Sequence, residues 1–293
     1  MLELIDISHH QGPVDFDRVI DAGIAGVICK CIDGRLPDID PMFETNWAAM
    51  RERQDQLVIG SYAFARPDTD GGGEADGRAE AEDYARTMIA AGVPDNFIVW
   101  ADVEHGGFDD ANHSVQMNCD FVGAWVETCE AELGRSPMIY TGTNTWREHM
   151  GWTMRFNHLH LVDADYRAVP DRTPWPWTFW QYTSTGQVPG VSTNVDINRY
   201  QGTLAELREL ERPRIIRPRR GPILPPLDLA GSGAYDPDVA RAQGLMLALG
   251  QPRAGLVDAT GRPDGVRGPS TRTAWFNLSG TTSTLVDWRI LLA

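Results

Sequence analysis

Two carboxylates stand two residues apart, at Asp102 and Glu104, where an apolar run that starts at Phe97 ends. The run has the composition of a buried β-strand, and residues i and i+2 of a strand point to the same face. Two acids in one pocket repel each other unless a proton, a metal or a ligand relieves the repulsion. Such a pair therefore indicates chemistry more often than packing.

Three kinds of chemistry could use this pair. Glycoside hydrolysis needs one carboxylic acid to protonate the leaving oxygen and a second carboxylate beside the developing positive charge. Metal-assisted hydrolysis could add ligands from Asp6 and from His9 or His105, although these residues do not show the HxxEH or HxH spacing of known metal sites. In the third case the acids bind a cationic or polyhydroxyl ligand without catalysis. The residues alone leave all three open.

The acids need a scaffold, and residues 1–211 alternate short apolar runs with longer amphipathic segments. The predicted strands are Leu2–Ser8, Gly26–Cys31, Val58–Phe64, Phe97–Val103, Pro137–Gly142, Leu159–Asp165, Thr178–Ser184 and Val195–Tyr200. The predicted helices include Phe16–Ala22, Pro41–Arg53, Glu74–Ala91 and Ser114–Leu133. Later connections are too short or too rich in Pro and Gly for full helices. We therefore expect an α/β fold, an irregular (β/α)-barrel of eight strands with about five helices.

In such a barrel the chemistry lies at the carboxyl ends of the strands. Polar or aromatic residues mark these ends: Asp6, Asp33, Tyr62, Phe64, Asp102, Glu104, Tyr140, Trp180, Gln181, Tyr182 and Asp196. Aromatic rings offer flat apolar faces and hydroxyl partners, so their coincidence with the acids favours a sugar as the ligand. We expect an acidic cup with aromatic walls.

Residues 212–233 differ from the barrel, because Arg212 to Arg220 is basic and interrupted by proline. Such a segment cannot continue a helix and is predicted to be a stiff, extended linker. Beyond it, Val239 to Leu249 shows helical spacing that Gly250 ends, and Pro269 is well placed to begin another helix. We predict a small all-α C-terminal domain at residues 234–293.

Composition restricts the partners of the chain. The net charge of −15 disfavours nucleic acid as a partner, since phosphate binding needs concentrated positive charge. Neither a signal peptide nor a membrane-spanning run is recognisable, so we expect no membrane insertion. The four cysteines have no zinc-ligand spacing, and Cys29 and Cys31 are predicted to be buried. We predict neither a metal nor a cofactor, and the sequence leaves the oligomeric state unknown.

Four motifs carry a resemblance to a known family. Asp6-Ile7-Ser8-His9-His10-Gln11-Gly12 resembles the DxSxxQG opening of family 25 glycoside hydrolases, the Chalaropsis-type lysozymes common among phage endolysins. Asp102-Val103-Glu104 resembles the DxE motif of that family, and Ile32-Asp33-Gly34 keeps an acid where the family has Thr-Glu-Gly. Trp180-Gln181-Tyr182 resembles its WQY segment, and Val195-Asp196 its closing VD motif. Order and spacing agree across residues 1–202.

This resemblance implies a muramidase that hydrolyses the β-1,4 bond between N-acetylmuramic acid and N-acetylglucosamine in bacterial peptidoglycan. By family analogy Glu104 would be the general acid, Asp102 would stabilise the transition state, and Asp6 and Asp196 would complete the acidic cluster. The substrate-binding residues would be Tyr62, Phe64, Tyr140, Trp180, Gln181, Tyr182 and Asp33. We expect neighbouring carboxylates to raise the pKa of Glu104.

The C-terminal segment resembles the type 1 peptidoglycan-binding domain, through Val239 to Gly250, Asp264-Gly265, Gly268-Pro269 and Trp275-Phe276. Together the two resemblances imply a phage endolysin that stays in the host cytoplasm until lysis and then acts at the cell wall. Two alternatives are a non-catalytic wall-binding virion protein and a metal-dependent polysaccharide deacetylase.

Overall fold

The computed structural model describes residues 1–68, 72–109, 113–168, 170 and 173–216, together with the short strands β9 (Leu227–Asp228) and β10 (Leu285–Val286). The chain divides into two compact units, one of residues 1–150 and 159–216 and another of residues 151–158 and 217–293. The predicted helical domain at 234–293 lies outside the described residues, apart from β10, which pairs antiparallel with β9.

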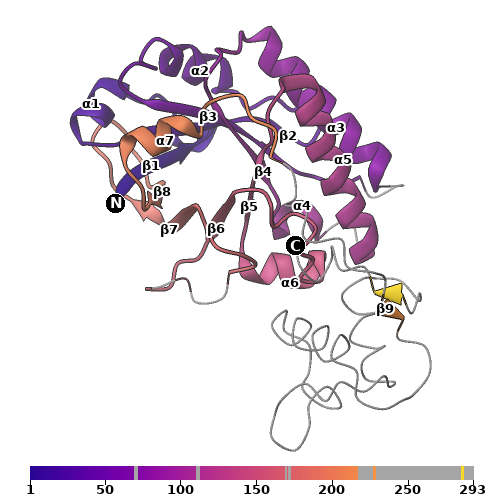
Figure 1. Ribbon diagram of the computed structural model, residues 1–293. Coiled ribbons are helices and arrows are strands. Elements are labelled where there is room, and N and C mark those ends of the chain that lie inside the picture. The colour runs from indigo at the N-terminus through magenta and orange to yellow at the C-terminus, as the bar shows by residue number, and fades with distance from the viewer. Residues whose placement is uncertain are drawn as a thin grey trace, which may run out of the picture. The chain divides into compact units, whose positions relative to one another are not determined.

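Eight strands close into a barrel in which each strand pairs with its neighbour in sequence (Figure 1). They are β1 (Leu2–Ile7), β2 (Gly26–Asp33), β3 (Val58–Phe64), β4 (Ile98–Asp102), β5 (Met138–Thr141), β6 (Leu161–Ala164), β7 (Phe179–Gly186) and β8 (Val195–Tyr200). The prediction of an eight-stranded α/β barrel is confirmed, and every strand lies within a few residues of its predicted position.

One strand of the barrel is reversed. Strands β1 to β7 run parallel to their neighbours, whereas β8 is antiparallel to both β7 and β1. The eight residues between Gly186 and Val195 are too few for the crossover that a parallel strand would need, so the chain turns back as a hairpin. The amino end of β8 therefore lies at the same rim as the carboxyl ends of β1 to β7.

Seven α-helices occur in the described residues, where about five were predicted. They are α1 (Phe16–Asp21), α2 (Phe43–Arg51), α3 (Glu74–Ala90), α4 (His105–Phe108), α5 (Val115–Leu133), α6 (Thr143–Met150) and α7 (Leu204–Glu209). The four predicted helices are α1, α2, α3 and α5. The additional helices α4, α6 and α7 have at most eight residues, too few for a clear apolar period in the sequence.

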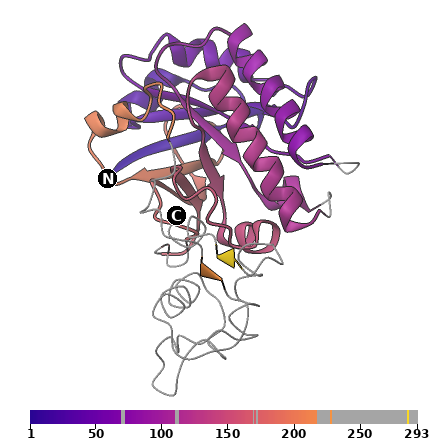
Figure 2. The same ribbon diagram turned by 45° about the vertical axis from the view of Figure 1, so that its right-hand side comes forward.

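The two long helices α3 and α5 pack side by side on the outside of the barrel (Figures 1 and 2). Gly77 of α3 permits this approach, because a Cβ atom at that position would lie 2.1 Å from the backbone oxygen of Phe121 in α5. The side chain of Ser114 caps the start of α5 by accepting a hydrogen bond from the Met117 amide, and left-handed Gly134 ends the helix.

The interior of the barrel is filled by alternate residues of its strands. An apolar layer is formed by Leu4, Ile28, Val58, Ile98, Trp100, Met138, Val162 and Phe179. Gly60 leaves space in this layer, since a Cβ there would lie 2.5 Å from Cδ1 of Ile28 and 2.8 Å from the backbone oxygen of Ile98. Because side chains alternate along a strand, the inward positions that follow this layer form the next one, at the rim.

Two further expectations concern the described residues. Within them, all four cysteines are buried, as predicted for Cys29 and Cys31. None of the helices in the described part of the chain combines the length and the hydropathy that a membrane span needs.

Candidate active site

The layer above the apolar core is polar and lies at the rim of the barrel. Its inward residues continue the alternation two positions beyond core residues: Asp6 in β1, Lys30 in β2, Asp102 in β4, Tyr140 in β5 and Gln181 in β7. Asp196, near the start of the reversed strand β8, pairs directly with Asp6 in the barrel register. The structure therefore brings Asp6, Asp102 and Asp196 to one rim, and Glu104 follows β4 as the N-cap residue of α4.

The carboxyl groups of Asp6 and Asp196 hold their protons unusually well. Burial raises the pKa of Asp6 to about 6, although hydrogen bonds from Asn198 and Gln181 oppose the rise. Burial raises the pKa of Asp196 to about 8, with additional repulsion from Asp6 and Glu104. The carboxyl groups of the rim thus act on each other electrostatically.

Asp102 and Glu104 behave as a pair. The pKa of Asp102 lies well above its usual range because of burial and then the charge of Glu104. The pKa of Glu104 is also raised, first by burial and then by Asp6. The expected direction for Glu104 is confirmed, but burial contributes more than the neighbouring carboxylates on which the expectation rested. Interacting acids of this kind titrate as a unit, and the pair can hold a proton that either carboxyl group alone in water would lose.

Gln181 connects the acids to two phenols. Its Nε2 donates a hydrogen bond to Asp6 Oδ2 over 2.9 Å. Its Oε1 accepts one from the hydroxyl of Tyr140 over 2.9 Å and one from that of Tyr166 over 2.8 Å. Asn198 Nδ2 donates to the same oxygen of Asp6 over 2.7 Å. Four side chains from β5, β7, β8 and the segment after β6 therefore fix the orientation of the Asp6 carboxyl group.

The opening motif joins the first strand of the barrel to the last, at the rim where the two meet. Gln11 is buried, and its Oε1 accepts a hydrogen bond from the Ser8 amide over 2.9 Å. Its Nε2 donates to the backbone oxygen of Asn194, just before β8, over 3.0 Å. Ser8 and Gln11 thus hold the end of β1 against the start of β8, which keeps Asp6 opposite Asp196.

Lys30 is a functional candidate that sequence reasoning missed. Its Nζ lies 2.7 Å from Asp33 Oδ2 and 4.7 Å from the centre of the Phe64 ring. Its positive charge lowers the pKa values of both Asp102 and Glu104, against the effect of burial. A signal was available, since Lys30 is the single lysine of the chain and interrupts an apolar strand.

Asp33 is placed differently from the other acids. Partial burial alone would raise its pKa, but hydrogen bonds from Arg66 and Lys30 outweigh that effect and lower the pKa below its usual value. Arg66 Nε lies 2.6 Å from Asp33 Oδ1, and the guanidinium also lies 5.0 Å from the centre of the Phe64 ring. Asp33 and Phe64 therefore belong to an ion-paired edge of the rim.

The predicted aromatic residues separate into two groups. Tyr62 lies with the acids, because the charges of Asp6 and Asp102 add to burial in raising the pKa of its phenol well above the usual range. Trp180 and Tyr182 flank Gln181 in β7 and consequently point to the other face. The Tyr182 hydroxyl donates to Glu3 over 2.8 Å, on the outer side of β1. The structure does not bring Trp180 and Tyr182 into the group around Asp6.

The metal set considered from the sequence is not assembled in the described residues. His9 Nδ1 lies 2.7 Å from Asp40 Oδ2, and His105 Nδ1 lies 3.1 Å from Asp109 Oδ1. In the described residues neither histidine forms an ion pair with Asp6, Asp102 or Glu104, so we assign no metal centre to these three acids.

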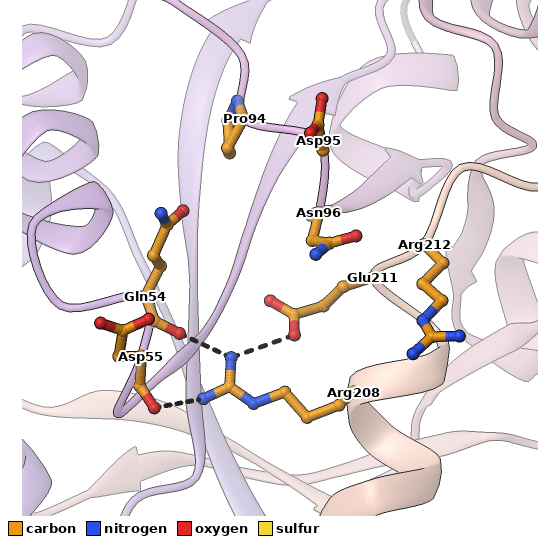
Figure 3. A pocket seen from close by; sticks show the side chains of 8 residues that line it. All are labelled: Gln54, Asp55, Pro94, Asp95, Asn96, Arg208, Glu211 and Arg212. Atoms are coloured by element: carbon orange, nitrogen blue, oxygen red, sulfur yellow. Dashed lines mark hydrogen bonds and ion pairs between the residues drawn. The ribbon is translucent and has the colours of Figure 1, made fainter.

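A separate pocket lies at the other end of the barrel, between the segments that precede β3 and β4 and the end of α7 (Figure 3). It has a volume of about 390 Å³ and is lined by Gln54, Asp55, Pro94, Asp95, Asn96, Arg208, Glu211 and Arg212. The guanidinium of Arg208 donates to the backbone oxygens of Gln54, Asp55 and Leu57 over 2.7 to 3.2 Å. The N–H groups of Arg208 are thus engaged in holding the base of the barrel together. We therefore do not assign the hydrolytic chemistry to this pocket.

Comparisons with known proteins match the barrel part of the chain. The family model of the glycosyl hydrolases family 25 matches residues 5–191. Lysozyme M1 of Streptomyces globisporus is 30% identical over 216 residues, which cover 70% of this chain and 70% of that protein. An N,O-diacetylmuramidase of a Chalaropsis species is 30% identical over 215 residues, covering 70% of this chain and 96% of that protein. The crystal structure of a bacterial lysozyme from Streptomyces coelicolor matches with a TM-score of 0.63 at 26% identity, over 72% of this chain and 96% of that chain.

Proposed function

The chain belongs to the glycosyl hydrolases of family 25, and we propose that it is a muramidase that cuts the β-1,4 bond between N-acetylmuramic acid and N-acetylglucosamine in peptidoglycan. Similarity to a lysozyme and to an N,O-diacetylmuramidase, each 30% identical, supports this substrate. The observation that carries the proposal is the group of four carboxyl groups at the rim, all with raised pKa values. Glycoside hydrolysis needs a carboxylic acid that stays protonated near a second carboxyl group.

Glu104 is proposed to be the general acid. Glu104 is partly buried, which raises its pKa, yet its side chain is still reached by solvent, whereas Asp102 is buried. An acid that must reach the leaving oxygen of a polymer needs this intermediate exposure. In this role Glu104 passes its proton to the glycosidic oxygen as the bond to the anomeric carbon breaks.

Asp102 is proposed to stabilise the positive charge that develops at the sugar. By family analogy the acetamido group of the substrate assists, and Asp102 holds the intermediate that results. This role requires Asp102 to be ionised while Glu104 is protonated. The positive charge of Lys30 favours ionisation of both, and the two acids compete for the proton that remains.

The remaining rim residues are proposed to orient the acids and the sugar. Asp6 and Asp196 raise the pKa values around them. Gln181 donates to the Asp6 carboxyl group and accepts from Tyr140, and the Tyr62 phenol feels the charge of Asp6. Asp33, with Lys30 and Arg66 paired to it beside the Phe64 ring, is proposed to offer a polar edge to the hydroxyl groups of a sugar.

Digestion of purified peptidoglycan tests the proposed bond. Mass spectrometry of the soluble fragments should find new reducing ends on muramic acid. Reducing-end glucosamine, freed amines or cleaved peptides would each contradict the proposal. Release of free amines that stops in EDTA and returns with metal would favour the deacetylase, and intact glycan would favour the non-catalytic wall-binding protein.

We further propose that the protein lyses a bacterial host, because the family 25 lysozymes that its motifs resemble are common among phage endolysins. The C-terminal segment at 234–293 is proposed to bind the wall, since a tether to an insoluble polymer raises the local concentration of cleavable bonds. Expression inside bacteria with and without a membrane-permeabilising protein tests the first proposal: lysis should occur when the membrane is breached.

A further inference from the structure

Three ligand-type side chains converge outside the group of rim acids. His105 begins α4, Asp109 is the C-cap residue of that helix, and His149 lies in the last turn of α6. His105 and Asp109 are four residues apart, a spacing that places both side chains on one face of a helical turn. The two imidazole rings meet edge to face with their centres 5.0 Å apart.

The three facing atoms form a small triangle. His149 Nε2 lies 2.8 Å from Asp109 Oδ1, His105 Nδ1 lies 3.1 Å from the same oxygen, and the two nitrogens are 3.1 Å apart. Zinc binds such atoms at about 2.0–2.1 Å, so its tetrahedral ligands lie about 3.3 Å from one another. The edges of the triangle are slightly shorter than this, and a small adjustment brings all three atoms to bonding distance of one ion.

A carboxylate and an anchoring hydrogen bond lie beside the triangle. The other ring nitrogen of His105, Nε2, lies 3.8 Å from Glu148 Oε2. Metal-ligating histidines usually direct their second nitrogen at a carboxylate or carbonyl group. The backbone oxygen of His149 accepts a hydrogen bond from Asn118 Nδ2 over 3.0 Å, which fixes α6 against α5. Two of the ligands thus come from one short helix and the third from an anchored neighbour.

We propose that His105, Asp109 and His149 form a binding site for one divalent transition metal ion, with Zn²⁺ as the best match. Two imidazoles and one carboxylate suit Zn²⁺ and disfavour Mg²⁺ and Ca²⁺, which prefer oxygen ligands. Three protein ligands leave the fourth tetrahedral position to water. The bound ion cross-links α4 to α6, and α4 is the helix that starts directly after Glu104.

This site is distinct from the proposed hydrolysis. Its ligands are not the rim acids, and Glu104 keeps its role as an acid whether or not the ion is bound. The ion is proposed to stabilise the segment of chain that follows Glu104, because a ligand that binds the folded state alone adds its binding free energy to the free energy of unfolding.

Metal binding by the EDTA-treated, dialysed full-length chain tests the site. Isothermal titration calorimetry with Zn²⁺ should give one ion per chain, and Zn²⁺ should raise the Tm. The variants Asp109→Asn and His149→Ala should each bind at least tenfold more weakly and lose most of the Tm increase. Asp109 is exposed, so Asp109→Asn keeps the test valid if His149→Ala fails to fold. Glu148→Gln should weaken binding by about tenfold, as loss of an outer partner does.

His10→Ala is the matched control, because it removes an exposed histidine that lies outside the triangle. It should bind Zn²⁺ like the parent chain. Failure of the parent to bind one Zn²⁺ would overturn the proposal, as would binding that Asp109→Asn and His149→Ala leave unchanged. Equal loss in His10→Ala would also overturn it, by assigning the ion to a different histidine.

Discussion

Gln181 donates a hydrogen bond to Asp6 over 2.9 Å, across 175 residues of sequence. The contact joins β7 to β1, the two strands that flank the reversed strand β8. The same amide accepts from Tyr140 and Tyr166, so one side chain sets the orientation of an acid and of two phenols.

Replacing Gln181 with leucine should raise the pKa of Asp6 above about 6, because the hydrogen bond from Gln181 lowers that pKa in the parent chain. Lytic activity should fall by at least about tenfold, since misplaced groups at a site cost rate steeply. The pH dependence of peptidoglycan solubilisation measures both effects. Gln116→Leu, which removes an exposed glutamine bonded to Asp120, is the control and should retain the parent profile. A parent-like profile in Gln181→Leu would contradict the proposed role.

Replacing Glu104 with glutamine should lower the rate of glycan cleavage by about 10²–10⁴-fold, the usual contribution of a general acid. Glutamine has nearly the same shape, so the Tm should change little. Release of reducing ends from purified peptidoglycan is the measurement. Retention of most of the activity would remove Glu104 from the proposed role and leave Asp102 as the better candidate.

Replacing Lys30 with methionine should move the pH–activity profile to higher pH. The Lys30 charge lowers the pKa values of Asp102 and Glu104, so its loss lets both carboxyl groups keep their protons to higher pH. Lys30→Arg keeps the charge and should keep the profile near that of the parent. A profile that stays in place in Lys30→Met, or moves to lower pH, would show that Lys30 does not set these pKa values.

Asp163 offers a test of stability away from the rim acids. Neither of its carboxyl oxygens has a hydrogen-bond partner among the described residues, and burial raises its pKa to about 7, with Asp165 raising it further and Arg167 lowering it. The folded chain keeps this proton up to about pH 7, whereas the unfolded chain loses it near pH 3.8. The free energy of unfolding therefore falls as the pH rises from 3.8 to about 7.

Asp163→Asn cannot ionise, so its stability relative to the parent should increase between pH 5 and pH 8. At pH 8 we expect a gain of about 1–3 kcal/mol relative to pH 5, because the parent chain must then ionise a buried carboxyl group that the asparagine variant leaves neutral, at about 1.4 kcal/mol per pH unit. Urea denaturation at both pH values measures it. Asp55→Asn, at an exposed position, is the control, and its free energy of unfolding should differ from that of the parent by a similar, small amount at both pH values. An advantage of Asp163→Asn that shrinks as pH rises would contradict the assignment.

Local patterns determined much of the barrel. Each strand was recognisable because a run of apolar, β-branched residues is a local property, and alternation placed Asp102 and Glu104 on one face before any contact was known. The same alternation could have excluded Trp180 and Tyr182 from the face of Gln181, and the single lysine could have drawn attention to Lys30.

The tertiary structure decided what depends on closure of the barrel. Reversal of β8 sets Asp196 beside Asp6, and burial at the rim raises the pKa values of the acids more than their mutual charge does. The meeting of His105 with His149 likewise requires α4 and α6 to pack together. Strand direction, burial and contacts between distant residues arise from packing of the whole chain, whereas periodicity and spacing are written in each short segment.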